Sequence, residues 1–225
     1  MSLLSALGFV FKINPNNFKA TDMQLILSEL QKDDRWLVLG NLVLRTMKKA
    51  IYSTDNVGHF GLGSDDYAQS TSPIRRLPDL YVHRSIKRHL LNESKYLEKV
   101  APADLAVTAD HSSMTEDGSV KCERAVEKYE SAKYMAKHIN EEYNAIISGI
   151  GREGIWIQLP NLIEGLVKIS EIGDEYYEFD EKSYIIKGSK SGSKYVIGQK
   201  IRVSVVASSL INREIDFGIV KKTIK

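Results

Sequence analysis

Residues 71–76 read Thr-Ser-Pro-Ile-Arg-Arg and bring two hydroxyl groups and two guanidinium groups onto one short segment. A guanidinium group can bind a phosphate through two hydrogen bonds at once, and hydroxyl groups supply further donors. Pro73 and Pro78 fix their own φ angles and favour extended conformations before them, so the segment between them is stiff. This pattern favours contact with a phosphodiester backbone through Thr71, Ser72, Arg75 and Arg76. The alternative is a polar loop that caps a helix, with both arginines in surface ion pairs.

The sequence around this segment is more basic than the chain as a whole. The 225 residues carry a formal net charge of +2 and a pI near 8.4, which does not by itself indicate a nucleic-acid partner. Residues 71–100, in contrast, hold seven basic and three acidic side chains. A basic stripe of this kind is typical of a protein that binds a polyanion. We expect a helix from Pro78 whose outward face either lines the path of a strand or is merely solvated, and which carries Arg84, Lys87 and Arg88.

Helical spacing of apolar residues predicts that most of the first 147 residues are α-helical. The first helix is expected to end near Gly8. A second is expected at 21–30, opened by a capping box of Thr21 and Gln24. A third is expected at 35–51, with Trp36 in the core.

Two apolar stripes in the later helices make further predictions. The helix from Pro78 is expected to bury Leu80, His83, Ile86 and Leu90, with His83 a hydrogen-bonded core residue rather than a catalytic base. From residue 104 to residue 147 the pattern is again helical, and residues 125–146 form a short heptad seam rich in alanine. The small side chains favour packing within the chain over a coiled-coil dimer.

After residue 148 the composition changes to glycine-rich segments in which apolar residues alternate with period two. Ile155, Ile157 and Leu159 face one way, whereas Trp156 and Gln158 face the other. Several short strands with glycine turns in about 75 residues predict a small barrel. The sequence therefore predicts an α+β protein, with a mainly helical part at 1–147 and a five-stranded β-barrel at 148–225.

Residues 59–83 closely resemble the signature at the end of the catalytic domain in the ribonuclease II/ribonuclease R (RNB) family. The matching residues are His59 to Leu62, Tyr67-Ala68, Thr71 to Arg76, Pro78-Asp79 and His83, whereas Ser70 and Leu77 depart from the pattern. The resemblance implies a processive 3′–5′ exoribonuclease that hydrolyses single-stranded RNA to nucleoside monophosphates. It also implies that Arg75 contacts the scissile or adjacent phosphate, and that Arg76 contacts a neighbouring phosphate or braces the loop.

The barrel region resembles the OB-fold RNA-binding domain named after ribosomal protein S-one. Gly149, residues 154–159 and residues 164–170 carry this resemblance, and Glu153 stands where an aromatic residue is frequent. It implies that single-stranded RNA is bound by Trp156, Lys168 and Arg213, although Trp156 packed at a domain interface is the alternative. Residues 174–181 and 213–217 resemble the ribonuclease R branch. The acidic run 174–181 is expected to be a strand edge or surface loop rather than a metal site.

The same resemblance implies Mg²⁺ held by four aspartates upstream of this sequence. Asp65 and Asp66 are the local carboxylate candidates, and a polar turn is expected there instead. We therefore expect the C-terminal, RNA-binding part of an exoribonuclease, with no metal ligands of its own, that is inactive alone and able to dimerise through surface exposed by truncation. One alternative is a stand-alone OB-fold RNA-binding protein with a helical scaffold, and another is a structural partner protein.

Several classes are disfavoured by the sequence. The single Cys122 excludes an intramolecular disulfide bond, and no apolar run approaches 18 residues. Residues 3–11 lack the pattern of a signal peptide. We expect a cytoplasmic protein without a membrane partner or a small-molecule cofactor.

Overall fold

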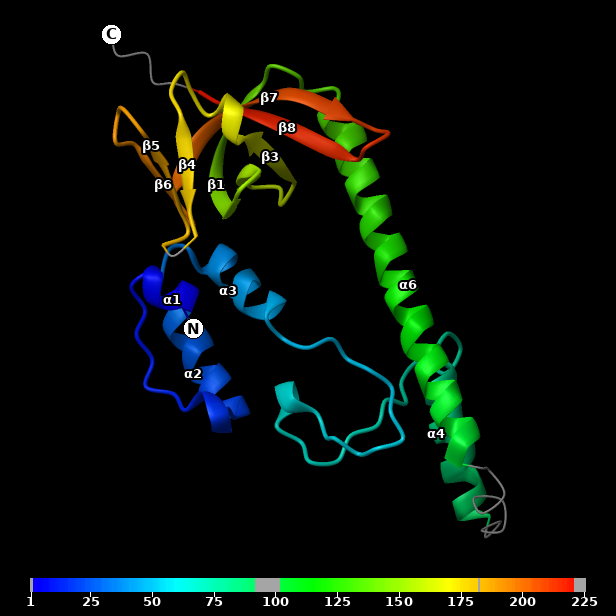
Figure 1. Cartoon of the computed structure of the whole chain (residues 1–225). Helices are drawn as coiled ribbons and strands as arrows, with labels where there is room; N and C mark the ends of the chain where they lie inside the picture. Colours follow the sequence, from blue (N-terminus) through cyan, green and yellow to red (C-terminus); the bar gives the residue numbers. More distant parts are fainter. Residues whose placement is uncertain (1, 92–101, 182, 221–225) are drawn as a thin grey trace. The chain divides into compact units, whose positions relative to one another are not determined.

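The computed structural model describes residues 2–91, 102–181 and 183–220 (Figure 1). The chain forms two compact units. The first comprises Met1–Asn14, Leu25–Thr46 and Arg124–Lys225, and the second comprises Pro15–Gln24 and Met47–Glu123. Because α2 (Ala20–Leu30) and α6 (Pro102–Met135) each contribute to both, each unit is described by itself.

The second unit combines short 3-10 turns and longer helices with a long loop. It contains η1 (Pro15–Asn17), η2 (Phe60–Leu62), α4 (Leu77–Leu90) and most of α6. The helix expected from Pro78 is confirmed as α4, in which proline occupies the first turn, where its missing N–H costs no intrahelical bond.

The burial expected for the apolar stripe of α4 is wrong. His83, Ile86 and Leu90 are exposed, and Leu80 is only half-buried. The buried residue of this helix is Asp79. The first turn of α4 contacts the preceding loop through Asp79, and of the expected stripe His83 also reaches this loop.

In the first unit, α1 (Ser2–Ala6) ends two residues before the expected Gly8, and α3 (Trp36–Arg45) is shorter than the helix expected at 35–51. The helix expected at 35–51 ends at Arg45, where the Thr46 hydroxyl donates to the carbonyl of Val43. Trp36 is half-buried against Gly40 rather than in the core. For α2, the capping bond comes from Asp22, which accepts from the backbone N–H of Lys19, and not from the expected box.

The helix expected to continue to residue 147 is also wrong, since α6 ends at Met135 and strand β1 (Glu142–Gly151) follows. In β1, Ala145 and Ile147 are buried and Ile146 between them is not, so the apparent heptad positions Tyr143 and Ile146 are strand positions. The boundary expected near Ser148 falls inside β1. We propose that the division lies between Met135 and Glu142.

The five-stranded barrel is confirmed. Its strands are β1, β2 (Gly154–Gln158), β3 (Glu164–Lys168), β8 (Glu214–Ile219) and β7 (Lys200–Ser209), in that order around a closed sheet. All neighbours are antiparallel except β3 and β8. Phe217 and the buried isoleucines and valines of these strands fill the interior, joined by Ala132 and Met135 at the end of α6.

A second sheet follows η3 (Ile169–Glu171) and was not anticipated from the sequence. It contains β4 (Tyr177–Asp180), β5 (Ile185–Gly188) and β6 (Lys194–Val196), all antiparallel (Figure 1). β4 is an edge strand of this sheet, as expected for the acidic run 174–181. Ile186 on β5 is fully buried and belongs to the same apolar cluster as the barrel interior.

Candidate nucleic-acid interface

The loop before residues 71–76 is fixed by its own side chains. His59 precedes η2, and its Nδ1 accepts a hydrogen bond from the backbone N–H of Leu62 at 3.1 Å. The imidazole ring also packs edge-on against Tyr67, with 4.6 Å between ring centroids. Gly58 has φ +66°, and a Cβ there would lie 2.4 Å from the carbonyl oxygen of Ser64, so only glycine fits. Residues 58–67, the first part of the expected signature, are therefore held together by contacts among themselves.

A buried carboxylate ties the arginine segment to α4. Oδ2 of Asp79 accepts hydrogen bonds from the backbone N–H of Ser72 and from Nη2 of Arg76, both at 2.7 Å. Nη2 of Arg76 also donates to the Thr71 hydroxyl at 3.2 Å. We call these bonds among Thr71, Ser72, Arg76 and Asp79 the Asp79 clamp. It closes the turn in which the N–H of Arg76 bonds the Ser72 carbonyl.

The clamp holds an ion pair away from water. The side chain of Asp79 is fully buried and that of Arg76 is 16% exposed. Burial alone would raise the pKa of Asp79, but the hydrogen bonds from Ser72 and Arg76 bring this pKa below its usual value. Among the described residues, Oδ1 of Asp79 and Nε of Arg76 are buried without a hydrogen-bond partner. The carboxylate is therefore charged at neutral pH and depends on its few partners.

The two neighbouring arginines consequently differ. Arg76 takes part in the clamp. Of the two roles expected for it, a phosphate contact or bracing of the loop, this position corresponds to bracing. Arg75 is exposed, and next to it the side chain of Ile74 is fully exposed at the apex of the turn. Arg75 is thus the guanidinium of this segment that an external phosphate can reach.

The basic residues of α4 are only partly equivalent. Arg84 and Lys87 are exposed, whereas Arg88 is half-buried. His83 is exposed rather than in the core, and its Nε2 lies 2.6 Å from the carbonyl oxygen of Ser70. This contact joins α4 to the loop beside the clamp, so His83 is a hydrogen-bonded structural residue as expected, at an unexpected place.

On the barrel, Trp156 offers an accessible ring. Its side chain is 40% exposed, and its strand neighbours are Leu166 on β3 and Gly149 on β1. A Cβ at Gly149 would touch the indole at 3.4 Å, so glycine leaves that side of the ring open. Gln158 faces the same way two residues later but is buried.

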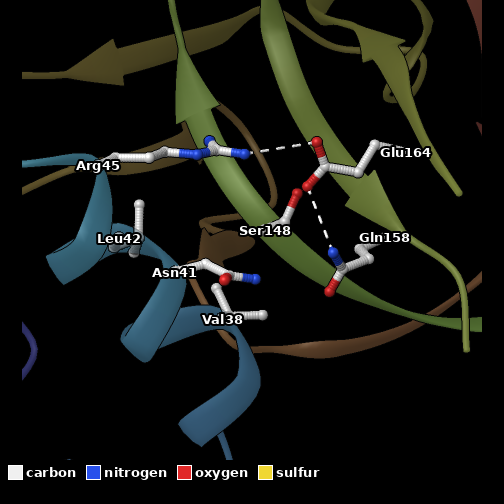
Figure 2. Close-up of a pocket in the computed structure, with 7 residues that line it drawn as sticks. All are labelled: Val38, Asn41, Leu42, Arg45, Ser148, Gln158 and Glu164. Atoms are coloured by element: carbon white, nitrogen blue, oxygen red, sulfur yellow. Dashed lines mark hydrogen bonds and ion pairs between the residues drawn. The ribbon is translucent and has the colours of Figure 1, made fainter. Parts of the chain in front are cut away.

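The reason for this difference is the packing of α3 (Figure 2). Arg45 at its end lies 3.5 Å from Glu164, and Glu164 accepts a 3.4 Å hydrogen bond from Gln158. The cavity left among these residues measures only about 10 Å³, which holds no more than a water molecule. This end of the barrel face is therefore an internal contact, whereas the Trp156 end is accessible.

The expected cation beside Trp156 is largely compensated. Nζ of Lys168 lies 2.7 Å from Oδ2 of Asp216, and this bond raises the pKa of Lys168. Glu171 and Glu214 add to the same effect. Arg213 is exposed in the β7–β8 turn with φ +58°.

We expect Asp216→Asn to strengthen the binding of single-stranded RNA, because it releases the ammonium group of Lys168 for a phosphate. The slope of log affinity against log salt concentration should become steeper by about 0.7, as expected for one added phosphate contact on a single strand. Equilibrium binding to an RNA oligonucleotide at several salt concentrations measures both. Unchanged affinity and slope would contradict a role of Lys168 in binding phosphate.

The residues that the structure describes do not supply a ligand set for magnesium. No cluster of three or more His, Cys, Asp or Glu side chains suited to a metal occurs in the described parts of the chain. Asp65 and Asp66 lie in an exposed turn, and the carboxylate of Asp66 accepts a hydrogen bond from the Asn56 amide. In the same described parts, no helix is long and apolar enough to span a bilayer.

Comparison with known proteins finds two domain families along the chain. The RNB domain family matches residues 2–92, and the S1 RNA binding domain family matches residues 137–219. The second match begins before β1, which agrees with a barrel that includes this whole strand.

Relatives that match most of the chain include ribonucleases R. Ribonuclease R 1 of Lactococcus lactis is 37% identical over 93% of this chain and 26% of its own length, and the Aquifex aeolicus enzyme is 34% identical over 99% and 31%. The apo structure of Mycoplasma genitalium RNase R matches with a TM-score of 0.89 at 27% identity, over 97% of this chain and 35% of that one. The chain thus spans about a third or less of these relatives. Over nearly its whole length it is similar to ribonucleases R, with an RNB domain match followed by an S1 RNA binding domain match.

Proposed function

We propose that this chain is the RNA-binding portion of a 3′–5′ exoribonuclease that degrades single-stranded RNA to nucleoside monophosphates. The observation that carries the proposal is the Asp79 clamp, which commits Arg76 and leaves Arg75 exposed beside it. Support also comes from the structure of Mycoplasma genitalium RNase R in complex with ribose methylated single-stranded RNA. It matches 97% of this chain with a TM-score of 0.87 at 28% identity.

Hydrolysis of a phosphodiester increases the negative charge on the phosphate oxygens in the transition state, and a fixed guanidinium stabilises that charge. In this proposal Arg75 contacts the phosphate, while Arg76 acts through the clamp as a positioning residue. The RNA strand that leads to this phosphate contacts Arg84 and Lys87, and also Arg88. A base of the RNA stacks on Trp156 of the barrel. A base stacked on an exposed aromatic ring contributes about 1–3 kcal/mol.

In this proposal the catalytic metal is bound only in the whole enzyme. Ribonucleases R are nucleases, and the Mg²⁺ that we expect the whole enzyme to use would be held by carboxylates outside the described residues of this chain. The chain alone is then inactive, and we further propose that the protein acts in the cytoplasm. Self-association of the isolated chain through apolar surface remains part of the proposal, because Ile86, Leu90 and Val107 are well exposed.

Incubating the chain with Mg²⁺ and single-stranded RNA labelled at either end tests this function. Binding and nucleotide release are measured on the same sample. We expect a complex with both labels intact over hours. A chain with Trp156→Ala should bind about tenfold more weakly, as loss of one stacked base predicts.

Two outcomes would contradict the proposal. Absence of RNA binding would remove the assigned role of both parts. Metal-dependent release of monophosphates would show that the catalytic carboxylates lie within this chain, and Asp65, Asp66 and Asp79 would be the first to substitute.

A further inference from the structure

The hairpin between β5 and β6 is held rigid by a single carboxylate. Oε2 of Glu175 accepts hydrogen bonds from the backbone N–H groups of Lys190 at 2.5 Å and Ser191 at 2.8 Å, and the Ser191 hydroxyl donates to Oε1. The bonds from Ser191 and Lys190 lower the pKa of Glu175 to about 2. Gly192 turns the chain with φ +66°. An exposed hairpin tip with this much internal bonding is preorganised for a contact.

The strand register in this hairpin places positive charges together. Lys187 on β5 stands directly opposite Lys194 on β6, an arrangement that destabilises a sheet unless another charge compensates it. Asp180 lies 3.3 Å from Lys187, and Glu178 is the partner of Lys187 on β4. In the described parts of the chain, no acidic side chain forms an ion pair with Lys190 or Lys194. The compensated charge is therefore Lys187, and the tip keeps two cations for an external anion.

An aromatic ring lies beside the same tip. The carbonyl of Tyr176 accepts from the backbone N–H of Ser189 at 2.9 Å, and its side chain is 73% exposed, more than that of Trp156. Tyr177 faces Tyr195, with 6.1 Å between ring centroids. Tyr176 directly precedes β4, and the alternation of side chains, carried one residue beyond the strand, puts it on the opposite face. This is the face of Lys187 and Lys194.

Exposed aromatic rings flanked by cations are the elements that bind single-stranded nucleic acid without sequence preference. On the barrel, Trp156 is accessible but Lys168 is paired with Asp216, so cation and ring are better combined on the small sheet. We propose that Tyr176, Lys190 and Lys194 form a second contact for single-stranded RNA, outside the barrel face. Tyr176 stacks on a base and the two lysines bind neighbouring phosphates. This inference rests on the proposed function and adds a site to it.

The test compares three forms of the chain in binding to an oligouridylate at several salt concentrations. In the double variant Lys190→Ala/Lys194→Ala, the slope of log affinity against log salt should fall by about 1.4, as expected for two lost phosphate contacts on a single strand. The matched control is Lys137→Ala/Lys200→Ala, which removes two exposed lysines of the same unit and should leave the slope unchanged.

The aromatic part is tested separately. Tyr176→Ala should weaken binding about tenfold, and Tyr176→Phe should restore it because the stacking face is kept. If the unsubstituted chain does not bind the oligouridylate, the proposed function itself fails. If it binds, and both lysine pairs give the same slope and Tyr176→Ala the same affinity, the second contact is contradicted while the proposed function stands.

Discussion

Asp79→Ala is expected to lower the free energy of opening of the loop and α4 by about 3 kcal/mol, the scale for removing one partner of a buried ion pair. The substitution leaves Arg76 buried with its charge uncompensated and the Ser72 N–H without its acceptor. Native-state amide hydrogen exchange of α4 reports this local free energy directly. Asp79→Asn should have a smaller effect, since it keeps an acceptor oxygen of the same shape.

Asp117 gives a matched control for this result. It is only half-buried on α6, and it pairs with two exposed cations, Lys49 and Lys121. Its replacement by alanine should change the exchange of α4 far less, because exposed ion pairs are screened by water. Equal effects at Asp79 and Asp117 would contradict the view that the buried clamp holds the turn.

The clamp also predicts a dependence on pH. The pKa of Asp79 is lower in the folded chain than its ordinary value of 3.8. Its stabilising contribution is therefore fully present above pH 3.8 and is lost as the pH falls through the folded value. Amide exchange of α4 between pH 5 and pH 3 should accelerate in the unsubstituted chain more than in Asp79→Asn, after correction for intrinsic rates. Identical acceleration in both would show that other carboxylates cause it.

Arg75→Ala is expected to reduce turnover about 100-fold in a ribonuclease R polypeptide that cleaves RNA and contains this segment, while RNA affinity changes only a few-fold. The reason is that the guanidinium interacts most strongly with charge that develops in the transition state. Single-turnover rates and equilibrium binding on the same preparation separate the two quantities. Arg75→Lys should recover part of the rate, since it returns the charge without the planar fork.

Arg124→Ala, at an exposed position on α6, is the control for loss of a surface arginine. Equal losses of turnover and affinity in Arg75→Ala would mean that Arg75 only binds RNA. A larger loss of turnover in Arg76→Ala, together with an intact turn, would transfer the phosphate contact to Arg76.

The barrel could be predicted from the sequence because apolar residues alternate along its strands and glycines mark its turns and close contacts. Ile155 and Ile157 are fully buried and Trp156 is not, as the period of two requires. Gly165 lies where a Cβ would stand 2.5 Å from the ring of Phe217, a contact that glycine on β3 avoids. Such positions leave a local signature in the residue types.

Tertiary bonding decided the features that the sequence did not predict. The spacing of Tyr143 and Ile146 fits a helix as well as a strand, and only pairing with β2 and β7 selects the strand. The sequence holds one signal for the pairing of Asp79, because Arg76 stands three residues earlier and Pro78 marks the first turn of a helix. Nothing in the local sequence, however, distinguishes a buried ion pair of this kind from an exposed one. The roles of Arg75, Trp156 and the other site residues stay predictions.

The central claim is that the RNB-domain segment and the S1 domain both bind one RNA strand. Photocross-linking of a single-stranded RNA that carries 4-thiouridine at many positions, followed by peptide mass spectrometry, tests it most directly. The account predicts cross-links to peptides containing residues 71–76 and to peptides containing Trp156. Cross-links confined to the S1 domain, with none to residues 71–88, would contradict it and leave the helical part as a scaffold.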